Sequence, residues 1–319
     1  MEILAQLVGG LVLLGLGGEG VVRGAVGIAR RLGLSELLIG LTLVGFGTSA
    51  PELLTSVNAA LSGSPGIALG NVVGSNISNV LLVFATVAMI RPMPVNPAAI
   101  TRDGLVMIAA ALVLIALALC TGELTRLAGG GLLTLLVIYI LTVWWIERRG
   151  GPAAQMHEGE AHSHDPAPQA LWLSAMFALG GLGLLVFGAD LLVAGAITLA
   201  RVAGMSETAI GLTIVAIGTS LPELVATLAA ALKGKSDVAF GNIVGSNIYN
   251  VFGILGVTSL VRPITIPEDV TLVDWAVFGG SGALLLLFAT TGKRVTRLEG
   301  ACLFVLYAAY VAYLLGVAR

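Results

Sequence analysis

Charge is scarce in this 319-residue sequence: Asp, Glu, Lys and Arg make up 11% of the residues, against 57% hydrophobic residues. A soluble domain carries about 25% charged residues. This deficit, with a mean hydropathy of +1.01, excludes an ordinary soluble domain and indicates a polytopic membrane protein. The formal net charge is −2, and we expect the lipid bilayer, and no nucleic acid, as the partner of the chain.

Cysteine is also scarce. Cys120 and Cys302 both lie in apolar stretches, so the sequence indicates no disulfide framework, and we expect both to be small buried residues. The chain begins with Glu2 in place of a basic segment, and a cleaved signal peptide is therefore not expected.

What the chain does have is a pair of polar motifs, each present twice within very apolar sequence. The first motif is GTSAPEL at 47–53 and GTSLPEL at 218–224; the second is GNVVGSNI at 70–77 and GNIVGSNI at 241–248. The shift is constant, since 223 − 52 and 246 − 75 both equal 171. An acid within the membrane is by default a functional-site hypothesis, and duplicated motifs are typical of transporters built from repeats.

Ten stretches are long and apolar enough to be spanning helices, which need about 20 residues each. In the first half they are 2–28, 35–62, 67–90, 103–121 and 125–146. In the second half they are 170–200, 206–232, 238–261, 272–290 and 297–317. The predicted fold class is therefore an all-α membrane protein with ten transmembrane helices.

These stretches divide the chain into a first five-helix repeat (1–146), a polar linker (147–169) and a second five-helix repeat (170–319). Because five is odd, the second repeat enters the membrane from the opposite face, which predicts inverted repeats. The linker contains His157, His162 and His164; a transition-metal site is conceivable there, but the composition favours a solvated linker.

Basic residues gather after the first, third, fifth, seventh and ninth predicted helices. They are Arg30, Arg31, Arg91, Arg102, Arg148, Arg149, Lys233, Lys235, Lys293, Arg294 and Arg297, against Arg126, Arg201, Arg262 and Arg319 on the other side. The positive-inside rule predicts that the linker is cytoplasmic, with both termini outside a cell (inner) membrane.

The first motif supplies hard oxygen ligands. Thr48 and Glu52 are four residues apart and share a helix face, while Pro51 should kink the helix and free carbonyls near residue 47. The second copy repeats this with Thr219, Pro222 and Glu223 and should free carbonyls near residues 216–218. Such oxygens suit Ca²⁺ or Na⁺ and not soft metals. Two carboxylates balance one divalent cation, and without a cation they would take up protons.

The second motif places more polar groups on shared helix faces. Ser75 and Asn79 are four residues apart, as are Ser246 and Asn250. The glycines of this motif have the spacing that lets membrane helices pack closely. Taken singly, a hydroxyl of this kind usually bonds its own backbone and an amide often links helices, but the duplicated set with two glutamates indicates a site.

The two motifs resemble the α-repeats of the cation/Ca²⁺ exchanger superfamily, in particular the prokaryotic sodium/calcium exchangers. The resemblance implies that the second, third, seventh and eighth helices surround the ions, and that the first and sixth slide for alternating access. It implies Ca²⁺ and Na⁺ as transported substrates, with no cofactor, and a monomer is expected. The implied ligands are the carboxylates of Glu52 and Glu223, the hydroxyls of Thr48, Thr219, Ser49, Ser220, Ser75 and Ser246, and the carbonyls of Gly45 and Ala216.

One departure concerns Asn79 and Asn250, because many relatives carry an Asp at one of these positions. The chain then has two core carboxylates, which leaves a H⁺-coupled or K⁺-dependent antiporter as an alternative to Na⁺/Ca²⁺ exchange. Two other classes are weaker. An intramembrane enzyme with Ser49 or Ser220 as nucleophile and a glutamate as base lacks a His or Lys base near either serine. A passive cation channel would show flux that is not coupled to a counter-ion. Glu19 and Asp190, also 171 apart, could mark an ion pathway or bond a neighbouring helix.

Overall fold

A computed structural model describes residues 2–31, 45–95, 100–147, 170–232, 234 and 236–317. Within these ranges, eight helices are long and apolar enough to cross a membrane, and a bent pair makes up to nine. Nine of the ten expected spans are thus found as helices. The remaining one, 35–62, lies partly outside the described residues and is seen from residue 45 onwards.

The described part of the first half consists of helices broken by short irregular segments. Its elements are α1 (Glu2–Arg31), α3 (Gly45–Thr48), α4 (Ala50–Leu61), α5 (Pro65–Ser78), η2 (Asn79–Phe84), α6 (Ala85–Ile90), β1 (Met93–Pro94), η3 (Ile100–Gly104), α8 (Leu105–Thr121), β2 (Glu123–Leu124) and α9 (Arg126–Glu147).

The second half follows the same order. Its elements are α11 (Leu171–Ala203), α12 (Glu207–Ile210), η4 (Gly211–Val215), α13 (Ala216–Thr219), α14 (Leu221–Leu232), α15 (Ser236–Ile248), η5 (Tyr249–Ile254), α16 (Leu255–Val261), β3 (Ile264–Thr265), α17 (Leu272–Gly292), β4 (Arg294–Val295) and α18 (Arg297–Val317). The elements labelled η are π-helical turns, which occur mostly as single-turn bulges inside α-helices and are frequent at functional sites.

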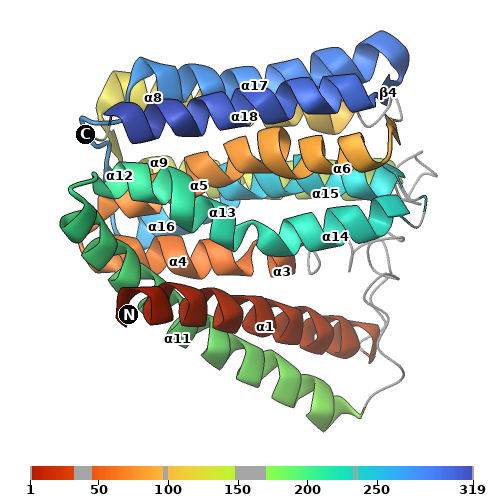
Figure 1. Cartoon of the computed structure of the whole chain (residues 1–319). Helices are drawn as coiled ribbons and strands as arrows, with labels where there is room; N and C mark the ends of the chain where they lie inside the picture. Colours follow the sequence, from red (N-terminus) through yellow and green to blue (C-terminus); the bar gives the residue numbers. More distant parts are fainter. Residues whose placement is uncertain are drawn as a thin grey trace.

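The helices form three layers that run roughly parallel (Figure 1). The long helices α1 and α11 lie side by side along one edge, and α8, α17 and α18 lie along the opposite edge. The broken helices α3–α6 and α12–α16 fill the middle layer, where most of the buried polar residues are found. The two chain ends lie at the same end of the bundle.

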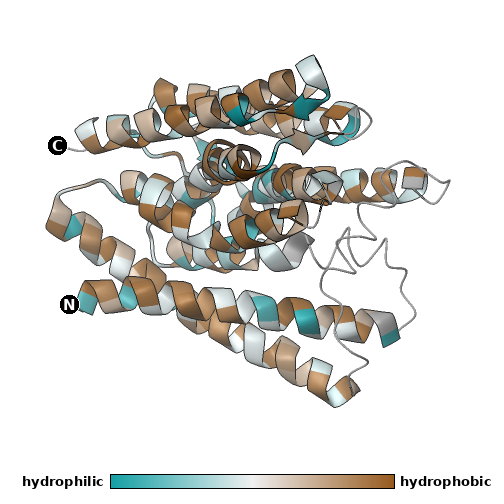
Figure 2. Cartoon of the chain, turned by 45° about the vertical axis from the view of Figure 1, so that its right-hand side comes forward, coloured by the Kyte–Doolittle hydropathy of each residue, from teal (hydrophilic) through white to brown (hydrophobic). Residues whose placement is uncertain are grey.

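The surface of the bundle is apolar, as a lipid-facing surface must be. Figure 2 shows hydrophobic residues along almost the full length of the long helices. Cys120 and Cys302 are part of this surface, since both are exposed. The prediction that they are buried was wrong because an apolar stretch in a membrane helix can face lipid as well as protein.

Local sequence explains several helix boundaries. α5 begins with Pro65 in the first turn, where its missing N–H has no helical partner to lose. α17 begins with a capping box, in which Thr271 and Asp274 each accept a hydrogen bond from the other's backbone N–H. α11 ends at Ala203 and is followed by Gly204, whose positive φ of 66° suits glycine.

The two halves contact each other reciprocally. Met93 of β1 pairs with Val295 of β4, and Ile264 of β3 pairs with Leu124 of β2. Each residue of the second pair is 171 positions from its counterpart in the first, as 93 + 171 = 264 and 124 + 171 = 295. Contacts exchanged in this way are the sign of a two-fold relation.

Two arginines repeat this reciprocity at the ends of the broken helices. Arg91 donates from Nη1 to the carbonyl of Leu232 over 2.8 Å, and Arg262 donates from Nη1 to the carbonyl of Leu61 over 2.7 Å. Each guanidinium therefore caps the last residue of α14 or α4, where a positive charge is favourable to the helix dipole.

Candidate cation site

The first motif breaks the helix that carries it, in both copies. Ser49 separates α3 from α4 with φ −89° and ψ 9°, and Ser220 separates α13 from α14 with φ −82° and ψ 4°. The axis bends by 43° at the second break, so the kink predicted from Pro222 is confirmed. Broken helices of this kind end inside the protein, where backbone groups and helix dipoles can face ions.

Glu52 and Glu223 occupy the first turns of α4 and α14. There the positive end of the helix dipole favours a carboxylate. Both side chains are completely buried (0% exposed). They approach one another, because Ser49 Oγ, three residues before Glu52, donates to Glu223 Oε1 over 3.4 Å. The two copies of the motif therefore converge on one place.

These carboxylates are short of partners. Among the described residues, nothing donates a hydrogen bond to either oxygen of Glu52 or to Glu223 Oε2. Buried polar atoms are normally satisfied, and a buried charge is costly unless it is paired or binds a metal. Three unpartnered carboxylate oxygens in one buried place are therefore the signature of a site that takes up cations or protons.

Asn71 ties the two motifs together. Its Nδ2 donates to the Glu52 carbonyl (3.1 Å) and to Ser56 Oγ (2.9 Å), while its Oδ1 accepts from Thr219 Oγ1 (2.9 Å). Ser75 Oγ lies 3.4 Å from the same Thr219 hydroxyl. One amide from α5 thus fixes α4 from the first half and α13 from the second.

Four asparagines form a symmetric cluster between α5–η2 and α15–η5. Asn76 Nδ2 donates to the Asn247 carbonyl (3.2 Å), and Asn247 Nδ2 reaches the Asn76 carbonyl (3.4 Å). Asn79 Nδ2 donates to Asn247 Oδ1 (3.1 Å), and Asn250 Nδ2 donates to Asn76 Oδ1 (2.8 Å). Each bond therefore has a counterpart between the residues 171 positions away, so the two halves contribute to the cluster symmetrically.

The side-chain oxygens of the predicted residues Asn79 and Asn250 have no hydrogen-bond partner among the described residues. Their Nδ2 groups hold the cluster together, whereas neither Oδ1 accepts a hydrogen bond from the part of the chain that the structure describes. Both side chains are buried; Asn79 is the first residue of η2 and Asn250 is the second residue of η5. Such oxygens are neutral acceptors that can bind a cation or a proton donor.

The other predicted residues lie in or beside this region, with differing partners. Thr48, Ser75, Ser220 and Ser246 are all buried. Ser220 Oγ accepts from Ser78 Oγ over 3.2 Å, and Ser246 Oγ has no hydrogen-bond partner among the described residues. Gly45 begins α3.

The Ala216 carbonyl differs from the expectation of a freed group. It accepts from the Ser220 N–H (3.1 Å) and from Thr219 Oγ1 (3.3 Å). The break after α13 is thus closed by the helix's own last turn, and this carbonyl is engaged within its own helix.

Sequence reasoning missed Asn71, Asn76 and Asn247 as members of the site. The signal was present, because all three lie in the repeated second motif. Selecting only residues four apart on one face discarded them, since their partners lie on other helices.

Glu19 and Asp190 bond neighbouring groups at the surface. Glu19 pairs with Arg23 within α1, and Asp190 accepts from Asn58 Nδ2 over 2.9 Å. Both acids are exposed. Asp190 bonds a neighbouring helix, as one of the two interpretations expects, whereas Glu19 pairs within its own helix.

Comparisons with known proteins agree with this geometry. The model of the family described as "Sodium/calcium exchanger protein" matches residues 2–145 and 173–316. The chain belongs to this family. The resemblance predicted from the two motifs is thereby confirmed, and membership makes the chain an integral membrane antiporter rather than an enzyme.

Individual relatives match over nearly the whole chain. CaxA of Alkalimonas amylolytica, named as a candidate antiporter, is 41% identical over 94% of this chain and 95% of its own length. The sodium/calcium exchanger MaX1 of Methanosarcina acetivorans is 34% identical over 96% of both chains. A structure of the sodium-calcium exchanger NCX_Mj, soaked with Na⁺ and Sr²⁺, has a TM-score of 0.64 at 33% identity and covers 98% of this chain and 99% of that one.

Proposed function

We propose that the protein is a secondary active antiporter that exchanges Na⁺ for Ca²⁺ across the membrane. The proposal rests on three carboxylate oxygens of Glu52 and Glu223 that have no hydrogen-bond partner among the described residues. Both side chains are completely buried. Family membership and the sodium/calcium exchangers among the relatives support the same ions.

Calcium fits the charge and the donor chemistry. Two carboxylates neutralise one divalent cation, and Ca²⁺ takes 6–8 oxygen ligands in flexible geometry. Hydroxyls of Ser49 and Thr219 lie within the same hydrogen-bonded region as the carboxylates. Without a positive partner the two buried charges would repel each other, so another cation, Na⁺ in this proposal, replaces Ca²⁺ when Ca²⁺ leaves. This competition couples the two fluxes.

Alternating access is proposed to come from α1 and α11 moving over the middle layer. α1 touches the broken helices at glycines: a Cβ on Gly47 would clash with the side chain of Val22, and one on Gly218 would clash with the side chain of Leu11. Both contacts lie directly before the breaks at Ser49 and Ser220. A shift of α1 would therefore act on the segments that hold the ions.

We propose that the halves are inverted repeats of five helices each, with the described two-fold contacts as support. The basic residues Arg91, Lys293, Arg294 and Arg297 flank the β1–β4 ribbon, at the end of the bundle opposite the termini (Figure 1). The positive-inside rule places this end in the cytoplasm, together with the linker 147–169, of which 148–169 lie outside the described residues. Because one chain supplies both copies of the motifs, we expect a monomer to be the functional unit.

The test uses Glu52→Gln and Glu223→Gln in proteoliposomes loaded with Na⁺. Each change keeps the shape of the side chain but removes one of the two charges that a divalent ion needs. We expect Na⁺-driven ⁴⁵Ca²⁺ uptake to be lost in both variants. Glu268→Gln, at an exposed acid in the loop before α17, is the matched control and should transport normally; normal uptake by either buried variant would refute the site.

The counter-ion is decided by the same vesicles. If Na⁺ is coupled, an outward Na⁺ gradient drives uptake at constant pH. If a pH gradient alone drives uptake, the protein is a H⁺/Ca²⁺ antiporter. The structural support for this alternative is the unpartnered amide oxygens of Asn79 and Asn250 and the buried pair of glutamates without a positive partner among the described residues. A requirement for K⁺ on the Ca²⁺ side would identify the K⁺-dependent variant.

A further inference from the structure

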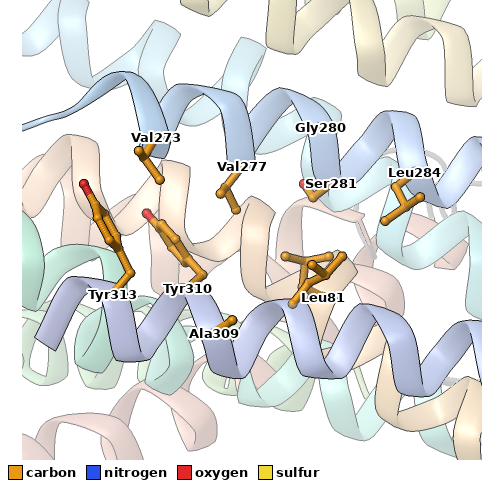
Figure 3. A pocket seen from close by; sticks show the side chains of 10 residues that line it. Leu81, Val273, Val277, Gly280, Ser281, Leu284, Ala309, Tyr310 and Tyr313 are labelled. Atoms are coloured by element: carbon orange, nitrogen blue, oxygen red, sulfur yellow. The ribbon is translucent and has the colours of Figure 1, made fainter. Parts of the chain in front are cut away.

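A cavity of about 360 Å³ lies outside the cation site, between α17 and α18. Figure 3 shows side chains of both helices pointing toward each other across it, with Val273, Val277 and Leu284 on one side and Tyr310 and Tyr313 on the other. Leu81 of η2 also lines it and is buried (2% exposed). Leu306 and Val273 are about 40% exposed (43% and 41%), so the cavity opens on the outer surface of the bundle.

The lining offers nothing polar to a ligand along its length. Ser281 Oγ donates to the Phe278 carbonyl over 2.9 Å, and the Tyr310 hydroxyl donates to Asp274 Oδ1 over 2.7 Å. The remaining labelled side chains are hydrocarbon, apart from the Tyr313 hydroxyl at one end. Because the hydroxyls of Ser281 and Tyr310 already have partners within the protein, the part of the occupant that lies along the cavity has to be apolar.

The dimensions of the cavity match one leaflet of a bilayer. It starts at Val273, one residue after α17 begins, and extends to Leu284. Eleven residues of α-helix rise about 16 Å, which is about half of the 30 Å hydrocarbon core. Both tyrosine hydroxyls point toward the Val273 end (Figure 3), and tyrosine prefers the membrane interface with its polar tip outward. The cavity therefore runs from the interface to the middle of the membrane.

Three of the ten lining positions have larger apolar side chains at their equivalents in the other half, and three others (Ser281, Leu284 and Tyr313) have smaller ones. Gly280 corresponds to Ala109, Ala309 to Ile138 and Leu81 to Phe252, each at the shift of 171. Val273 corresponds to Arg102, a charge that would not line an apolar channel. Gly280 and Ala309, the smallest lining residues of α17 and α18, thus make room at places where the first half has larger side chains.

We infer that this cavity binds one acyl chain of a membrane phospholipid, with the headgroup beside Tyr313 and the chain end near Leu284. If the cavity were empty, the side chains that line it would lose dispersion contacts. Each methylene group of an acyl chain that enters the cavity restores such contacts and stabilises the bound lipid. The chain contacts Leu81, two residues from Asn79, so the lipid packs against the π-helical turn that borders the cation site. The inference requires only that the protein spans a membrane.

The experiment uses the full chain in vesicles that contain a trace of phospholipid with a diazirine in the middle of one acyl chain. After photolysis, labelled residues are mapped by peptide mass spectrometry. We expect wild-type labelling to concentrate on the facing sides of α17 and α18. Ala309→Ile or Gly280→Leu should fill the cavity from one wall or the other. Each should lower this labelling about tenfold, which corresponds to a loss of about 1.4 kcal/mol in binding free energy.

Ala308→Ile is the matched control, because Ala308 is exposed on the same helix but does not line the cavity. It should label as wild type does. Labelling spread evenly over the lipid-facing helices, or unchanged in both filled variants, would overturn the inference, as would labelling by a free diazirine-bearing hydrocarbon but not by the phospholipid. Labelling does not depend on transport, so this result stands apart from that of the flux assay.

Discussion

Replacing Asn71 by alanine is the sharpest test of how the cation site is held together. The amide makes three hydrogen bonds that leave its own helix, two to α4 at the Glu52 carbonyl and Ser56 Oγ and one to α13 at Thr219 Oγ1. Its repeat counterpart Asn242 makes one described hydrogen bond, to Thr227 Oγ1 at 2.9 Å. The same substitution at the two positions therefore removes three interhelical bonds in one case and one in the other.

The expected magnitudes follow from this difference. Interhelical hydrogen bonds in membrane proteins are worth about 0.6 kcal/mol on average. Asn71→Ala should then lower the free energy of unfolding by about 2 kcal/mol, and Asn242→Ala by about 0.6 kcal/mol. Because Asn71 also orients the Thr219 hydroxyl, Asn71→Ala should in addition raise the Ca²⁺ concentration needed for half-maximal flux.

Unfolding in mixed micelles by titration with sodium dodecyl sulfate measures the first quantity, and ⁴⁵Ca²⁺ uptake over a range of concentrations measures the second. Each variant serves as control for the other, since the residue type, the change and the repeat position are identical. Equal losses of stability at residues 71 and 242 would refute the argument that the asymmetric network around Asn71 holds the site.

Three further outcomes are expected. Gly74→Ala should cost about 1–3 kcal/mol, because its Cβ would lie 2.7 Å from Ala216 Cβ, whereas Gly245→Ala has nothing within 4 Å and should change the unfolding titration by less than about 0.5 kcal/mol; similar costs would contradict the packing. Arg91→Gln removes the guanidinium from the last carbonyl of α14 and should lower the melting temperature in detergent, with partial recovery in Arg91→Lys; an unchanged melting temperature in Arg91→Gln would exclude a stabilising cap. Ca²⁺ at a hundred times its dissociation constant should stabilise the wild-type protein by about 2.7 kcal/mol and leave Glu52→Gln unaffected, and equal stabilisation of both would place the ion elsewhere.

Much of the cation site was accessible from the sequence, for a specific reason. A polar group in an apolar helix is costly, so Glu52 and Glu223 stand out without any knowledge of the fold. Duplication at a constant shift shows that the two copies have similar surroundings, and proline directly before each glutamate predicts the break in the helix. These inferences depend on composition and local backbone chemistry alone.

Other features depend on which helix lies beside which. The exposure of Cys120 and Cys302, the engaged carbonyl of Ala216 and the three bonds of Asn71 could not be predicted, because each is decided by a neighbour distant in the sequence. The cavity beside Leu81 is of the same kind: Gly280 and Ala309 are ordinary small residues until α17 and α18 are placed side by side.

The sequence by itself determined that this chain lies in a membrane, that it is built twice from one pattern, and that two acids and their neighbouring oxygens carry its chemistry. Only the tertiary structure decided that the two acids share one buried place, with three of their four oxygens left without hydrogen-bond donors among the described residues. The physical reason is that the sequence of one helix already shows a costly acid in an apolar segment. Which groups surround that acid and offset the cost depends on how helices from both halves pack.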